Sequence, residues 1–125
     1  MKKIIFIFFL LSLFTYANSE ILKCNVDTYY KFRNEGWESG ENRIFIVTID
    51  DISLEIYNQT ADQNWGTYFI FNDHQNFINA LQDTSEDSSA IDFLTYNKTN
   101  GYFKYLGTNN YGETLHQGWC LNNLN

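Results

Sequence analysis

The sequence predicts an all-β protein, a small antiparallel meander of seven or eight strands that closes into a barrel, with at most one short helix. Most segments alternate apolar and polar residues with a period of two, which is typical of half-buried strands. The connections between the expected strands are local, which favours antiparallel pairing. A bond between Cys24 and Cys120 would join the first strand to the last. Because closure removes exposed strand edges, we favour a barrel over the alternative, a two-sheet β-sandwich.

Residues 1–17 have the three parts of a cleavable secretory signal. Two lysines follow the first methionine, an apolar run covers residues 4–14, and small residues come next. The apolar run is too short for a membrane-spanning helix, which needs about 20 apolar residues. Cleavage after Ala17 or after Ser19 would place small residues at both recognition positions. The rest of the chain, residues 18–125, is then a single all-β domain of ordinary size.

The signal predicts an exported protein, either periplasmic or secreted. In such a compartment Cys24 and Cys120 are expected to form a disulfide. The mature chain keeps six basic residues (the eight of the whole chain minus the two lysines of the signal) against fifteen acidic ones, a net charge of −9. This charge favours a cationic protein as partner and repels nucleic acid and anionic lipid. We therefore expect no nucleic-acid partner and, after signal cleavage, no membrane contact.

The first expected strand covers residues 23–33, where alternate residues are expected to point inward. These inward residues are Cys24, Val26, Thr28, Tyr30 and Phe32. Residues 34–42 are polar and contain two glycines, which predicts a loop. Residues 43–49 are β-branched and aromatic, and together with residues 52–57 they predict a hairpin. The inward residues of its second strand are Ile52, Leu54 and Ile56.

The second half of the chain continues the same alternation. Further strands are expected at residues 65–71, 90–96, 102–106 and about 113–121. Residues 73–82 fit either a short helix or a short strand, because their apolar residues satisfy both patterns. Residues 83–89 are polar and predict a surface loop, and Asn100-Gly101 is a turn dipeptide between two strands.

No residue pattern in the chain predicts catalysis. The two histidines, His74 and His116, lie far apart in the sequence, and the cysteines are expected to be used in a disulfide. A nucleophilic triad therefore has no apparent members. Two isolated histidines do not make a zinc site, and the acidic loops do not match a calcium-binding loop. We expect no catalytic residue, no metal, no cofactor and a protein that is not an enzyme.

Trp37 is the candidate binding residue. It lies in the polar loop with Glu35, Glu38 and Glu41 around it. A tryptophan among carboxylates is typical of a hot spot for a cationic surface, or of a stacking platform for a sugar ring. The alternative is that Trp37 folds back and covers one end of the barrel.

Three functions are compatible with these features. The first is a non-catalytic binding or inhibitory protein that engages a cationic partner through its acidic loops. The second is a small barrel that binds an apolar ligand, which requires an open interior of a few hundred Å³. The third and least favoured is a hydrolase, which requires that His74 or His116 face a cleft beside a carboxylate.

A signal, one small strand-rich domain and a cysteine near each end also make the layout similar to that of small periplasmic β-barrel proteins. The bacterial inhibitors of C-type lysozyme are among them. The Ser-Gly-x-x-Tyr and Lys-Gly-x-x-Ala motifs of that inhibitor family are missing here. The resemblance is therefore one of size and compartment, and it assigns no functional residue.

Overall fold

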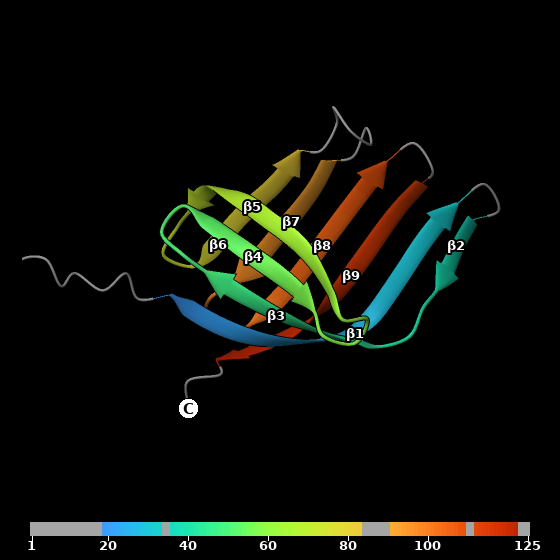
Figure 1. Ribbon diagram of the computed structural model, residues 1–125, viewed down its shortest axis with the longest axis horizontal. Helices are drawn as coiled ribbons and strands as arrows, with labels where there is room; N and C mark the ends of the chain where they lie inside the picture. Colours follow the sequence, from blue (N-terminus) through green and yellow to red (C-terminus); the bar gives the residue numbers. More distant parts are fainter. Residues whose placement is uncertain (1–18, 34–35, 84–90, 110–111, 123–125) are drawn as a thin grey trace, which may run out of the picture.

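The computed structural model describes residues 19–33, 36–83, 91–109 and 112–122, and this part of the chain contains nine strands and no helix (Figure 1). The predicted signal, residues 1–17, lies outside the described residues. The strands are β1 (Glu20–Arg33), β2 (Gly36–Ser39), β3 (Arg43–Ile49), β4 (Ser53–Asn58), β5 (Gln63–Asp73), β6 (Phe77–Asp83), β7 (Ile91–Asn97), β8 (Tyr102–Asn109) and β9 (Gly112–Asn122). No helix that could cross a bilayer occurs among these residues.

Eight of the strands form a closed antiparallel ring. From β3 to β9 each strand pairs with the next along the chain, and β1 pairs with both β3 and β9. The extra strand β2 pairs with the last part of β1, beyond the region that pairs with β3. The prediction of an antiparallel meander that closes into a barrel is therefore confirmed, and the barrel rather than the sandwich is the fold.

The disulfide lies where the ring closes. Cys24 of β1 and Cys120 of β9 are direct partners across the two strands, and their sulfur atoms are 2.01 Å apart. The bond joins residues separated by 96 positions. The predicted pairing of the first strand with the last is therefore confirmed.

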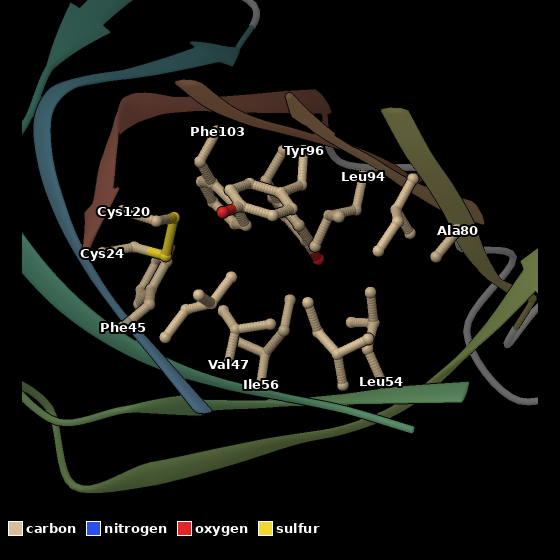
Figure 2. Close-up of a cluster of buried hydrophobic side chains, with 14 of the residues drawn as sticks. Cys24, Phe45, Val47, Leu54, Ile56, Ala80, Leu94, Tyr96, Phe103 and Cys120 are labelled. Carbon is tan, nitrogen blue, oxygen red and sulfur yellow. A yellow bond between two sulfur atoms is a disulfide. The ribbon is translucent and has the colours of Figure 1, made fainter. Parts of the chain in front are cut away.

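The interior is filled by apolar side chains from opposite walls (Figure 2). Phe45, Val47, Leu54 and Ile56 project from the hairpin of β3 and β4, and residues of β6, β7, β8 and the disulfide face them. The facing residues labelled in Figure 2 are Ala80, Leu94, Tyr96, Phe103, Cys24 and Cys120. The expectation that Ile52 points inward is wrong, because β4 begins at Ser53 and Ile52, in the turn before it, is 69 % exposed.

The alternation of β1 reverses part of the way along the strand. The register with β9 shifts between Val26 and Thr28, so Asp27 is an additional residue on β1. A β-bulge of this kind moves the following residues to the opposite faces of the sheet. Tyr29 consequently packs inside against His116. The expectation that Thr28, Tyr30 and Phe32 continue the inward face is therefore wrong, and Tyr30 and Phe32 are 41 % and 40 % exposed.

Two other segments differ from expectation or resolve an alternative. The loop expected at residues 34–42 contains the short strand β2, which forms because β1 extends past β3 and offers an edge. Residues 73–82 contain the strand β6 rather than a helix, because both neighbouring strands pair with it. Ile78 and Ala80 of β6 point into the core. Most of the loop expected at residues 83–89 lies outside the described residues.

Apolar side chains also form a row on the outside of the barrel. Neighbouring strands place them opposite one another in register. The row consists of Phe69, Leu81, Phe93, Leu106 and Leu115. Phe69 and Phe93 are the exposed members. Not all large apolar side chains are therefore used in the core, and Phe69 and Phe93 lie on the outer surface in this row.

Replacement of both cysteines, Cys24→Ser with Cys120→Ser, should lower the free energy of unfolding by about 4 kcal/mol. The reason is that the bond closes a long loop and so restricts the unfolded chain. Urea unfolding of the oxidised protein and of the double variant measures this difference. A reductant should destabilise the native protein and leave the double variant unchanged. Equal stabilities of the two oxidised proteins would contradict the expected role of the bond.

Candidate functional site

One end of the barrel holds an open pocket of about 300 Å³. Because neighbouring strands are antiparallel, β3, β5, β7 and β9 all begin at this end. Their inward residues near these starts line the pocket, together with residues from the last parts of β1 and β8. The aromatic and imidazole rings of the lining are Tyr29, Trp65, Tyr68, Tyr105 and His116. The other lining residues are Arg43, Asp92, Gly107 and Thr114.

His116 lies at the centre of an aromatic cluster. Its ring stacks on Tyr29 with a centroid distance of 4.5 Å. Three further rings surround it at centroid distances between 5.3 and 5.5 Å. These rings belong to Phe45, Trp65 and Tyr105. The ring is only 2 % exposed, and neither ring nitrogen has a hydrogen-bond partner among the described residues.

This environment keeps the imidazole uncharged. Burial, together with the nearby charge of Arg43, lowers the pKa of His116 from its usual 6.5 to about 3. The charged form loses its hydration in the apolar cluster, and burial is the larger of the two causes. At neutral pH His116 is therefore a neutral part of the pocket wall.

A chain of hydroxyl groups runs from Tyr68 through Tyr105, which packs beside His116, and ends at Asp92. The Tyr68 hydroxyl donates to the Tyr105 hydroxyl at 3.3 Å. The Tyr105 hydroxyl and the Thr108 backbone N–H donate to the carboxylate of Asp92. Burial raises the pKa of Tyr68 to about 12 and also raises the pKa of Tyr105. Both tyrosines are therefore neutral hydrogen-bonding groups.

Asp92 is the acidic group of the pocket. Burial raises the pKa of its carboxyl group, and the hydrogen bonds from Tyr105 and Thr108 oppose that rise. The two hydrogen bonds stabilise the ionised carboxylate, whereas burial deprives it of hydration. A cation that enters the pocket would replace part of that lost hydration. Asp92 lies on β7, one residue after the start of the strand.

Arg43 is the basic group of the pocket. It is the first residue of β3, and its guanidinium lies 4.4 Å from the centre of the Tyr29 ring, a cation–π contact. In the ring of eight strands β3 and β7 are four strands apart in either direction, so Arg43 and Asp92 come from opposite walls. Within the described residues the single ion pair is Lys98–Asp73, and Arg43 and Asp92 do not pair with each other.

The acidic loop predicted as a binding surface is described only in part. Glu38 on β2 and Glu41 after it are exposed. The backbone of Trp37 pairs with Phe32 of β1, while its side chain and the whole of Glu35 lie outside the described residues. A joint site of Trp37, Glu35, Glu38 and Glu41 stays a prediction.

The two histidines lie in different surroundings. His74 is exposed in the turn between β5 and β6, beside Phe77. His116 lines the same pocket as Asp92, but its nitrogens make no hydrogen bond to any described residue. A general base normally needs an orienting partner on its second nitrogen. Within the described residues no group of three or more metal-ligating side chains is present.

Arg43, Asp92 and the aromatic residues of the pocket are not among the candidate site residues that the sequence predicts. A signal for the two charged residues was present in the alternation of their strands. Arg43 is in phase with the inward Phe45 of β3, and Asp92 is in phase with the inward Leu94 of β7. A charged residue on the apolar face of a strand is unusual unless it is paired or lines a site.

The fold and the site define a small disulfide-closed β-barrel with an open, mixed aromatic and polar pocket at one end. Comparison of the chain with protein-family models, with curated proteins and with solved structures found no match. The geometry of the pocket is therefore the basis on which a function is proposed.

Protonation of His116 should make the protein less stable in acid. Between about pH 6.5 and pH 3 the unfolded chain binds a proton at this position and the folded chain does not, so stability falls as the pH is lowered. The slope contributed by one such group is at most about 1.4 kcal/mol per pH unit. Urea unfolding at several pH values should show this contribution in the native protein and not in His116→Phe. If the two proteins lose stability in parallel, the uncharged state of His116 does not affect folding.

Proposed function

We propose that the protein is an exported barrel that binds a small ring-containing molecule in the end pocket. The observation that carries the proposal is the contrast between the two parts of the interior. One part is filled by apolar side chains, whereas the other is open and lined by aromatic rings with a few polar groups. Such a lining is typical of small-molecule sites. Because a water molecule occupies about 30 Å³ in the liquid, this pocket offers room for about ten non-hydrogen atoms.

The shape and chemistry of the lining favour a planar or ring-shaped ligand. Tyr29 and Trp65 offer aromatic walls to an apolar ring. The hydroxyl groups of Tyr68, Tyr105 and Thr114 can orient polar substituents. Since Arg43 and Asp92 also line the pocket, the ligand is amphipathic rather than purely apolar.

Export is part of the proposal. The pairing of Cys24 with Cys120 is compatible with an oxidising compartment outside the cytosol. The predicted signal at residues 1–17 supports a periplasmic or secreted location more directly. A ligand of this barrel would then be a molecule of the cell envelope or of the surroundings.

A second candidate function is binding of a cationic protein. Its support is the exposure of Glu38 on the short edge strand β2 and of Glu41 just after it, on a chain of net negative charge. Under this proposal Glu38→Gln with Glu41→Gln weakens binding to a basic probe protein such as a C-type lysozyme, and added salt weakens it further. Glu55→Gln, which removes an exposed carboxylate from β4, is the control. Equal binding by native protein and double variant would end this candidate.

Filling the pocket should abolish binding of ring compounds. Thr114 faces Gly107 across β8 and β9, and Asp92 lies on the other side of Gly107. The ring introduced by Thr114→Phe therefore extends over Gly107 toward Asp92 and occupies the pocket. Indole and 4-methylbenzyl alcohol are suitable neutral probes, and shifts of backbone amide signals in NMR titrations report their binding. We expect the native protein to show shifts at pocket residues of β1, β5, β8 and β9, and Thr114→Phe to show a loss of affinity of at least about tenfold.

The matched control is Glu113→Phe. It places the same side chain at the neighbouring exposed position of β9. This variant should bind both probes as the native protein does. The proposed function is wrong if neither the neutral probes nor charged ring compounds of the same size shift the pocket signals, or if shifts occur only at residues outside the pocket.

A further inference from the structure

The pocket presents two opposite charges to any molecule that enters it. Arg43 projects from β3 and Asp92 from β7, and these strands stand opposite each other in the eight-stranded ring. They do not form an ion pair with each other. The space between them is bordered by aromatic rings. A ligand that spans the pocket therefore meets a guanidinium at one wall and a carboxyl group at the other.

The wall at Asp92 favours a cationic group. Its carboxylate accepts hydrogen bonds from Tyr105 and from the backbone of Thr108. Tyr105 packs against Trp65 with a centroid distance of 5.2 Å, so aromatic rings lie next to the carboxylate. Aromatic faces beside a carboxylate are the usual surroundings of a bound ammonium group.

The wall at Arg43 favours a carboxylate. A guanidinium can donate two parallel hydrogen bonds to a carboxylate, and it stays charged at every physiological pH. Its neighbours in the pocket are the stacked rings of Tyr29 and His116, and His116 is uncharged. No described acidic side chain other than Asp92 lines the pocket and would repel the ligand's carboxylate.

A ligand with only one charge would satisfy only one wall. When a ligand displaces water from the pocket, the remaining charged group loses hydration without gaining a partner, which is costly. A ligand with a charge at each end avoids that cost at both walls.

Resting on the proposed function, we infer that the natural ligand is a zwitterion, a small ring with an ammonium group toward Asp92 and a carboxylate toward Arg43. The juxtaposition of these two residues on opposite walls of one aromatic pocket is the basis of the inference. The ring occupies the space beside Tyr29 and Trp65.

Four probes with one carbon skeleton test the inference on the native protein. They are 4-(aminomethyl)benzoate, 4-methylbenzoate, 4-methylbenzylamine and 4-methylbenzyl alcohol, which are respectively a zwitterion, an anion, a cation and a neutral molecule at pH 7. Isothermal titration calorimetry at low salt measures their affinities. We expect the zwitterion to bind at least about tenfold more tightly than each of the other three.

Variants of the two walls separate the contributions. Arg43→Gln should remove the advantage of the zwitterion over 4-methylbenzylamine, and Asp92→Asn should remove its advantage over 4-methylbenzoate. Lys104→Gln and Glu55→Gln remove one exposed charge of each sign from outside the pocket and should preserve the native order of affinities. Thermal unfolding of every variant verifies that it is folded. If a wall variant does not fold, the comparison of the four probes on the native protein still decides the matter.

The outcomes distinguish this inference from the proposed function. If the neutral probe binds in the pocket and the zwitterion binds no better than a singly charged probe, the inference is overturned and the pocket remains a ligand site. If none of the four probes binds, the inference is overturned, and the proposed function fails as well when indole also leaves the pocket signals unshifted. A zwitterion preference that persists in both wall variants would also overturn the inference, because other residues would then be responsible.

Discussion

The pairing of β1 with β9 is the interaction on which the rest of the structure depends. It extends from Leu22 opposite Asn122 to Phe32 opposite Glu113, and the disulfide lies within it. Without this pairing the meander is an open sheet, whose core face would lack its opposite wall. The same pairing brings Tyr29 against His116. The same strand pairing therefore closes the core and forms part of the pocket wall.

A single additional residue determines which side chains of β1 face the open end of the barrel. The bulge at Asp27 turns Tyr29 inward, where its ring lies flat against His116 and contacts Arg43. In a regular strand the inward positions would belong to Tyr30 and Phe32. The bulge thus places the ring of Tyr29 in the pocket wall and leaves Tyr30 and Phe32 on the outside.

The pocket end contains buried polar groups that lower the stability of the barrel. His116 is buried with both nitrogens unpartnered among the described residues, and Asp92 is a partly buried carboxyl group. Unpartnered buried polar atoms lower stability, and apolar residues of similar size would often raise it. The core cluster follows the usual rule and is apolar, and Asn58 at the end of β4 is the other buried polar side chain with an unpartnered atom among the described residues. Departures from that rule concentrated in one place are typical of a binding site.

The sequence by itself determined the strands other than β2 and β6, their antiparallel order and the joining of the first strand to the last, since alternation and cysteine position can be read directly from the chain. Only the tertiary structure decided which inward residues meet. The pocket takes its lining from six strands, and it depends on the register of each pair and on the bulge at Asp27. The pairing of β6 with β5 and with β7 likewise makes this segment a strand, although its sequence also fits a helix. Arg43 and Asp92 lie 49 positions apart in the chain, and no local pattern relates them. They share a pocket because the ring closes, which is a property of the whole sheet.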